Sequence, residues 1–196
     1  MNDLKSICVF CGSSEGTDPK IIEQASLLGQ KLAAHQLTLI YGGSQLGIMG
    51  KVAKATLANG GKAIGIIPEF LKTKEIVYPD LDEIITTQNM HERKLKMQEM
   101  SDGFITLPGG FGTFEELFEI ITWSQLGLHH KPIGLLNTNG FYDHLIAMLD
   151  EMVKRGFLNK NNRELLIEDA DVERLLQKMK AFEPDHTSKF LKPENT

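Results

Sequence analysis

The sequence lacks the features that direct a chain to a membrane or to a nucleic acid. None of its apolar runs approaches the roughly 18 residues that a membrane-spanning helix requires. Residues 1–10 place their charges before a short apolar stretch, which is not the pattern of a signal peptide, so we expect a cytoplasmic protein. The net charge of −5 is without the basic excess typical of nucleic-acid binders. We therefore expect neither a membrane nor a nucleic acid as a partner.

Cysteine is scarce, and the two cysteines that are present do not indicate a metal or redox site. Cys8 and Cys11 have the spacing of a CxxC pair, but they lie in an apolar run, residues 6–11, that predicts a buried strand. Side chains three residues apart on a strand point to opposite faces of the sheet. Zinc would need a second pair of ligands, and the histidines offer no HxxxH or HExxH spacing. We predict no metal and no cofactor.

Three common catalytic signatures are absent as well. The loop at residues 41–50, YGGSQLGIMG, does not have the G-x-G-x-x-G spacing of dinucleotide-binding loops. The P-loop ending is missing because Val52, instead of serine or threonine, follows Gly50-Lys51. No serine lies in a G-x-S-x-G elbow. ATP hydrolysis and serine-hydrolase chemistry are therefore unsupported, and close helix–sheet packing is a sufficient explanation for Gly47 and Gly50.

The sequence does contain a regular alternation of strand-like and helix-like segments. Apolar runs predict strands near residues 6–11, 37–41, 62–67, 83–87, 103–107 and 132–136. Helical periodicity marks residues 19–35, 47–59 and 90–100, a segment running to about residue 126, and a last helix with an apolar face from Phe141 to Val153. This order predicts an α/β fold: a single-domain, doubly wound, Rossmann-like parallel sheet with helices on both faces. The domain is expected to cover residues 1–183, followed by a polar C-terminal tail at 184–196.

Glycine and serine follow three of the predicted strands. In doubly wound sheets, ligands bind at the carboxyl ends of the strands, near the point where strand order reverses. Glycines allow backbone N–H groups to approach an anion, and the next helix adds the positive end of its dipole. We therefore expect an anionic ligand at Gly12-Ser13-Ser14, Gly42-Gly43-Ser44 and Gly109-Gly110 with Gly112-Thr113.

The loop PGGFGTFEE, residues 108–116, carries the most information. One interpretation is a capping box, with Thr113 as the N-cap of a helix and Glu116 three residues later. A capping box does not require Gly109, Gly110 or Gly112, whereas a phosphate cradle does. The helix dipole would hold a carboxylate here in its ionised form. Glu116 is thus predicted to stabilise a cation or to act as a base, more than to donate a proton.

A charged helix follows the strand predicted at 83–87. Its first residues include His91, Glu92, Arg93 and Lys94, which could be a solvated face or part of a site. Arg93 is suited to bidentate binding of a phosphate or a carboxylate. The irregular, charged segment 69–83 is expected to be a long connection and a site loop.

These motifs together resemble those of the Lonely Guy family, the cytokinin riboside 5′-monophosphate phosphoribohydrolases. The family pattern PGGxGTxxE matches residues 108–116, adjacent Arg-Lys matches Arg93-Lys94, YGGxxxGxMG matches residues 41–50, and ITWxQLG matches residues 121–127. The resemblance extends from about residue 5 to about residue 155. It implies homodimers with sites near the subunit interface. Relatives have often been labelled lysine decarboxylases, but nothing in this sequence marks a Schiff-base lysine.

The resemblance implies hydrolysis of N6-modified adenosine 5′-monophosphates, and of AMP, to free base and ribose 5-phosphate. It implies that Arg93 and Glu116 are catalytic. Together with the glycine loops it points to these substrate contacts: Gly12, Ser13, Gly43, Glu75, Lys94, Gly109, Gly110, Phe111, Gly112, Thr113, Phe114, Glu115 and Thr122. Glycosidic cleavage passes through an oxocarbenium-like ribosyl cation, which a carboxylate stabilises.

Two other functions use the same kind of fold. A nucleotide-binding sensor or carrier would use the glycine cradle without turnover. An NAD(P)-linked oxidoreductase is disfavoured because the G-x-G-x-x-G loop is missing. The hydrolase hypothesis ranks first.

Overall fold

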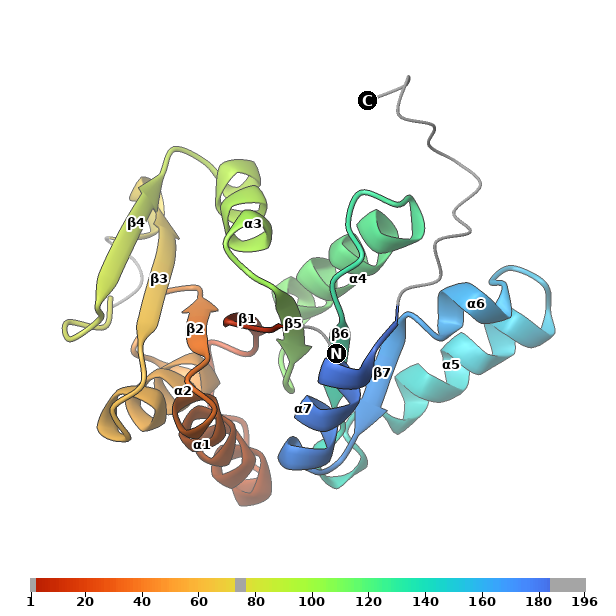
Figure 1. Cartoon of the computed structure of the whole chain (residues 1–196), viewed down its shortest axis with the longest axis horizontal. Helices are drawn as coiled ribbons and strands as arrows, with labels where there is room; N and C mark the ends of the chain where they lie inside the picture. Colours follow the sequence, from red (N-terminus) through yellow and green to blue (C-terminus); the bar gives the residue numbers. More distant parts are fainter. Residues whose placement is uncertain (1–2, 73–76, 184–196) are drawn as a thin grey trace.

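The computed structural model describes residues 3–72 and 77–183, and these form one parallel sheet with helices on both faces (Figure 1). The sheet has seven strands in the order β4-β3-β2-β1-β5-β6-β7, and every neighbouring pair is parallel. The strands are β1 Ser6–Phe10, β2 Thr38–Tyr41, β3 Ala63–Pro68, β4 Glu83–Thr87, β5 Gly103–Thr106, β6 Ile133–Leu136 and β7 Leu166–Asp169. The predicted fold class is confirmed, and strand order reverses between β1 and β5.

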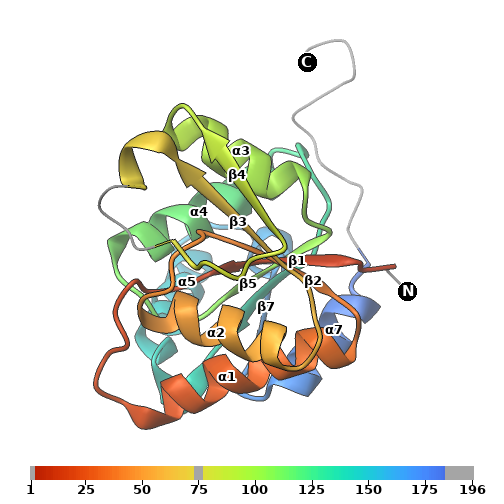
Figure 2. The ribbon, with the colours of Figure 1, turned by 90° about the vertical axis from the view of Figure 1, so that its left-hand side faces the viewer.

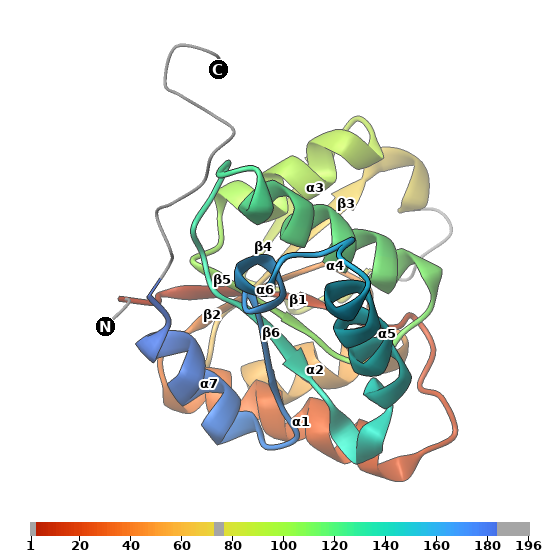
Figure 3. The same ribbon diagram turned by 90° about the vertical axis from the view of Figure 1, so that its right-hand side faces the viewer.

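Helices cover the two faces of the sheet in separate layers (Figures 2 and 3). The first layer comprises α1 (Pro19–Ala34), α2 (Gly47–Ala58) and α7 (Val172–Ala181). The second comprises α3 (Met90–Glu99), α4 (Phe111–Gln125) and α5 (Asp143–Lys154), with the short α6 (Lys160–Arg163) after α5. Short 3-10 turns lie at Glu69–Leu71 and Thr138–Gly140. Within the described ranges, no helix combines the length and apolar character needed to cross a membrane.

Alternation along β1 shows how the central strands supply both cores. Ile7 and Val9 belong to the core under α1 and α2, and Cys11, just past the strand, continues this face. Cys8 and Phe10 belong to the core under α3, α4 and α5. Both cysteines are buried free thiols, which confirms the prediction that they are strand-type core residues on opposite faces.

Helix α1 begins where local capping chemistry predicts. Asp18 is its N-cap and accepts a hydrogen bond from Lys20 N at 2.9 Å, and Pro19 is its first residue. Gly29 allows α1 to lie against α2, since a Cβ at this position would lie 2.4 Å from Val52 O. This close packing fixes α2, whose N-terminus borders the carboxyl edge of the sheet.

Two parts of the expected fold need correction. Helix α5 begins at Asp143, so Phe141 precedes it and is half-exposed instead of joining the apolar face, because Asn139 turns the chain with φ of 52°. Strand β7 and helix α7 are additions to the fold expected from the sequence. The strand has only two apolar residues, Leu166 and Ile167, before its acidic end. The proposed tail, 184–196, lies outside the described residues, so the domain boundary stays a prediction.

Candidate active site

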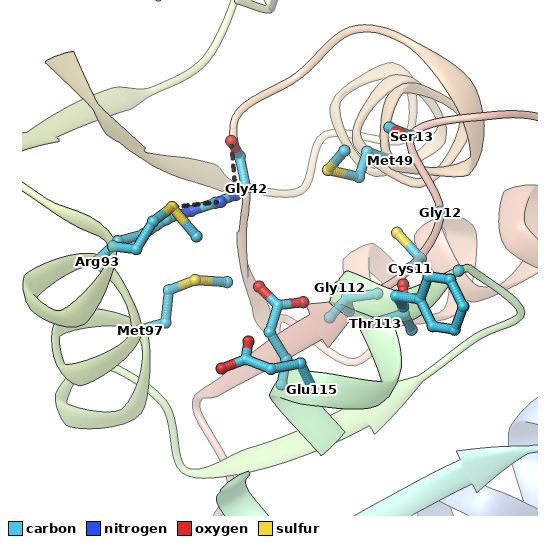
Figure 4. Close-up of a pocket in the computed structure, with 15 residues that line it drawn as sticks. Cys11, Gly12, Ser13, Gly42, Met49, Arg93, Met97, Gly112, Thr113 and Glu115 are labelled. Carbon is cyan, nitrogen blue, oxygen red and sulfur yellow. Dashed lines mark hydrogen bonds between the residues drawn. The ribbon is translucent and has the colours of Figure 1, made fainter. Parts of the chain in front are cut away.

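A cavity of about 290 Å³ opens at the carboxyl ends of β1 and β2, between α3 and the start of α4 (Figure 4). This is the edge where strand order reverses, as expected for a doubly wound sheet. Its walls come from the loop after β1, the residue after β2, the first turn of α2, one face of α3 and the first two turns of α4. The three glycine-bearing strand ends are thus brought together, as the sequence predicts.

The glycine loop before α4 leaves the N-terminus of this helix open. Helix α4 starts at Phe111, and its N-cap, Gly110, provides no side-chain hydrogen bond. At both Gly110 and Gly112, an added Cβ would meet no described atom within 4 Å. Thr113 is therefore the third residue of the helix and Glu116 the sixth, so the capping-box interpretation is wrong. The open first turn can instead bind an anion through backbone N–H groups.

The other glycines of these loops are required by close packing. A Cβ on Gly109 would lie 2.1 Å from Thr113 Oγ1 and 2.8 Å from Gly12 N. Gly12 N donates a hydrogen bond to Pro108 O at 3.1 Å, which joins the loops after β1 and β5. Gly47 has φ of 59°, and its Cβ would lie 2.2 Å from the carbonyl carbon of Ser13. A packing role is therefore confirmed for Gly47, although it contacts a loop and not the sheet.

Arg93 crosses from α3 to the ends of two strands. Its side chain is buried, with Nε donating to Ile66 O of β3 at 3.0 Å and Nη2 donating to Gly42 O at 3.3 Å. Figure 4 shows it extending from α3 toward Gly42. Among the described residues, no carboxylate oxygen lies within salt-bridge distance of its guanidinium. A guanidinium has five N–H donors, so Arg93 keeps donors and its positive charge available to the cavity.

Glu116 lies on the cavity wall, and its charge state is the main electrostatic feature of the site. Burial raises the pKa of Glu116 to about 7. The nearby carboxylates of Glu115 and Glu119 raise it further, while the positive charges of Arg93 and Lys94 lower it. Burial thus opposes the ionised form that the helix-dipole argument predicts, and near neutral pH the carboxyl can both accept and donate a proton.

Lys94 ties α3 to α4. Its ammonium lies 2.5 Å from Glu115 Oε1 and 2.9 Å from Glu119 Oε1. Burial lowers the pKa of Lys94, but the hydrogen bonds and charges of Glu115 and Glu119 together outweigh it, so the pKa lies above its ordinary value. The ion pairs hold together the two helices that carry Arg93 and Glu116. Lys94 does not line the cavity, so its expected contact with the substrate stays a prediction.

Known proteins of the same family are similar over most of the chain. A family described as "possible lysine decarboxylase" matches residues 49–179. Cytokinin riboside 5′-monophosphate phosphoribohydrolase LOG2 of Arabidopsis thaliana is 43% identical over 93% of this chain and 86% of its own length. LOG5 of the same plant is 44% identical over 92% of this chain and 79% of its own length. The chain belongs to the LOG family.

Solved structures extend this similarity to the fold. The molybdenum cofactor binding protein from Rippkaea orientalis superposes with a TM-score of 0.68, over 90% of this chain and 95% of its own, at 24% sequence identity. At that identity the likeness shows the fold alone. The sequence comparisons therefore show membership of the LOG family, and the comparison with solved structures separately supports the fold.

The predicted site residues of this LOG-family chain fall into two groups. Those that line the cavity are Gly12, Ser13, Arg93, Gly110, Phe111, Gly112, Thr113, Glu115 and Glu116. The others lie elsewhere: Phe114 packs edge-on against Tyr142, Gly43 lies against Gly65, and Gly109 packs beneath Thr113. Thr122 donates to Phe118 O at 2.7 Å and borders a separate cavity of about 250 Å³. Glu75 lies outside the described residues.

Sequence reasoning missed the sulfur-rich wall of the LOG-family site. Met49 of α2, Met90 and Met97 of α3, and Cys11 line the cavity. Met90, Arg93 and Met97 stand at positions i, i+3 and i+7, the spacing of one helix face. This spacing could have identified them, because it places two polarisable apolar side chains beside the arginine. Together they give one wall of the cavity an apolar, polarisable surface.

Proposed function

We propose that this chain hydrolyses the N-glycosidic bond of N6-modified adenosine 5′-monophosphates and of AMP, releasing free base and ribose 5-phosphate. The observation that carries the proposal is the joint placement of a buried arginine, a carboxyl that titrates near 7 and an open helix N-terminus around one cavity. Relatives that are 41–44% identical are named cytokinin riboside 5′-monophosphate phosphoribohydrolases. The sensor and oxidoreductase alternatives are not favoured by these relatives.

The 5′-phosphate is assigned to the first turn of α4. Gly110 and Gly112 leave space there, so backbone N–H groups can approach phosphate oxygens, and the helix dipole favours a negative charge. Ser13, across the same cavity, supplies a hydroxyl for a further hydrogen bond. With the phosphate at the first turn, we assign the ribose to the part of the cavity that Glu116 lines, further along α4.

Glu116 is assigned the chemistry at the ribose. As the C1′–N bond breaks, its electrons leave with the base, which takes up a proton from solvent, and positive charge develops at C1′. The ionised carboxylate stabilises this charge and accepts a proton from the water that attacks C1′. A pKa of about 7 suits this proton transfer, since it lies near the working pH.

Arg93 supports this carboxylate and the phosphate end of the substrate. Its positive charge lowers the pKa of Glu116 and so increases the fraction that is ionised at pH 7. Its remaining N–H donors can bind ribose or phosphate oxygens. Because two backbone carbonyls already fix the guanidinium, it needs little rearrangement when substrate binds.

The base is assigned to the methionine wall. Met49, Met90 and Met97 offer adaptable apolar contacts, and none is a strong donor or acceptor for the exocyclic amino group. Such a wall accepts a substituent on N6 as readily as the bare amino group. The lysine decarboxylase label receives no support, because no lysine is among the residues that line this cavity in the described part of the chain.

We also propose a cytoplasmic homodimer with one catalytic domain, residues 1–183. The support for a dimer is an apolar groove formed by Phe118, Ile121, Leu149, Met152 and Leu158, beside the exposed Phe157. Thr122 borders this groove. Light scattering on purified protein tests the assembly, and a monomer at micromolar concentration would contradict it.

The decisive experiment is chromatography of free base after incubation with AMP and, separately, isopentenyladenosine monophosphate. Wild-type protein should release base and Glu116→Gln should not. Glu23→Gln, a change at an exposed glutamate of α1 that lines neither the cavity nor the groove, is the matched control and should keep the wild-type rate. Thermal stabilisation by both nucleotides without any base release would support the sensor instead.

A further inference from the structure

The position of the Arg93 side chain depends on residue 42 being glycine, which has no side chain of its own. Gly42 follows β2, and a Cβ built on it would lie 2.2 Å from Arg93 Nη2, 3.0 Å from Met49 Sδ and 3.5 Å from Arg93 Cζ. The first of these distances is far below van der Waals contact. The guanidinium therefore occupies the volume that any other residue at position 42 would fill.

The backbone of Gly42 also holds the same nitrogen. Its carbonyl oxygen accepts the hydrogen bond from Arg93 Nη2 at 3.3 Å, while Ile66 O accepts from Nε at 3.0 Å. Gly42 is not among the glycines of this chain with a positive φ, so its backbone does not require glycine. Space for the arginine is thus the feature that excludes a side chain here.

We propose that Gly42 is a positioning residue that directs the guanidinium of Arg93 into the catalytic cavity. The inference rests on the proposed function for its effect on turnover, but the placement of Arg93 can be tested without turnover. Substitution by alanine should displace the arginine and leave the fold intact, because the closest atom is the end of a side chain and not the backbone.

Displacement of Arg93 should also change the titration of Glu116. Arg93 and Lys94 of α3 lower the pKa of Glu116, while Glu115 and Glu119 of α4 raise it. The buried thiols of Cys8 and Cys11, at β1, also interact electrostatically with Glu116. Moving the guanidinium away would leave the carboxyl with less stabilisation of its anion. The acidic limb of the rate profile should therefore move to higher pH in Gly42→Ala, an effect that simple loosening of the fold would not produce.

A double-mutant cycle with Arg93→Lys tests the inference. Lysine keeps the charge but has no Nη2, so the new methyl group can occupy the vacated space. We expect Gly42→Ala alone to reduce kcat by about 100-fold, the size of effect that a displacement of about 1 Å can cause. On the Arg93→Lys background, the same change should alter kcat by less than about twofold and leave the pH profile in place.

When turnover is too low to follow, urea unfolding measures the interaction between positions 42 and 93. The four proteins are the wild type, Gly42→Ala, Arg93→Lys and the double variant. Gly42→Ala should lower the unfolding midpoint when Arg93 is present, and it should leave the midpoint unchanged in the Arg93→Lys background. Gly134→Ala is the control, since its Cβ would lie 2.8 Å from Met179 Sδ, away from the cavity. It should keep the wild-type kcat. Equal effects of Gly42→Ala on both backgrounds would overturn the inference, whereas absence of base release by wild type would overturn only the proposed function.

Discussion

Lys94 Nζ on α3 lies 2.5 Å from Glu115 Oε1 on α4, and this ion pair joins the helix that carries Arg93 to the helix that carries Glu116. The Lys94 side chain is largely buried, whereas that of Glu115 is half-exposed, so the pair is only partly screened by solvent. Glu119 Oε1, at 2.9 Å, completes the contact. The helices that carry the two proposed catalytic groups are therefore joined by an ion pair between neighbouring residues.

Replacing Lys94 by methionine should affect the rate through Glu116. The change removes a cation that lowers the pKa of Glu116 and leaves Glu115 and Glu119 without their partner. The acidic limb of the rate profile should move to higher pH, and the free energy of unfolding should fall by about 1 kcal/mol. Lys96→Met is the control, because the Lys96 ammonium pairs with Glu99 at an exposed position of the described chain. An unchanged limb in Lys94→Met would contradict the assigned electrostatics.

The rate itself should depend on the ionisation of Glu116. If the carboxylate is the active form, kcat should rise as the pH increases from 5 and level off above about 7, the pKa of Glu116. The substrate phosphate also titrates, near pH 6, so the profile should be measured with saturating nucleotide. A kcat that stays constant from pH 5 to 8 would exclude Glu116 as the base.

Glu116→Gln should stabilise the fold at neutral and alkaline pH. The pKa of Glu116 is higher in the folded chain, about 7, than its ordinary value of 4.5, so its contribution to stability is fully present below pH 4.5 and is lost as the pH rises through 7. Glutamine does not ionise and escapes this loss. The difference in free energy of unfolding should grow to at most about 3 kcal/mol by pH 8. Chemical unfolding of both proteins at pH 4.5 and pH 8 measures it, and a constant difference would be the contrary result.

Gly112→Ala should separate stability from substrate binding. Gly112 is in the first turn of α4, where alanine is a better helix former by about 0.5–1 kcal/mol, and the added Cβ meets no described atom within 4 Å. The variant should unfold at the same or a slightly higher temperature. Its KM for AMP should rise by about 10-fold or more, because the methyl group enters the space assigned to the phosphate. Binding of adenosine, which has no phosphate, should change little, and an equal loss for both ligands would argue against this assignment.

Much of the sheet could be predicted from the sequence because buried parallel strands produce continuous apolar runs, as in residues 6–11 and 103–107. Strand β7 could not, because an edge strand with two apolar residues gives almost no periodic signal. Helix α7 did carry a helical pattern of apolar residues in Val172, Leu175, Leu176 and Met179, all buried, so this helix could have been predicted.

Those parts of the candidate site that depend on a few neighbouring residues of the sequence could be predicted. The glycine loop and the position of Arg93 follow from short motifs. The pKa of Glu116 does not, since it depends on how far α4 and its neighbours exclude water from the carboxyl. The bonds of Arg93 to Ile66 and Gly42 join positions 27 and 51 residues apart, and no local pattern encodes them.

The arginine is fastened to β2 and β3, whereas Glu116 lies on the helix that follows β5, on the other side of the point where strand order reverses. The two members of the pair therefore belong to different halves of the sheet. A chain in which each half has formed but the halves have not yet docked would contain both residues and no working centre. Recovery of turnover during refolding should thus report the docking of the two halves, and it should follow the formation of helices and strands in time.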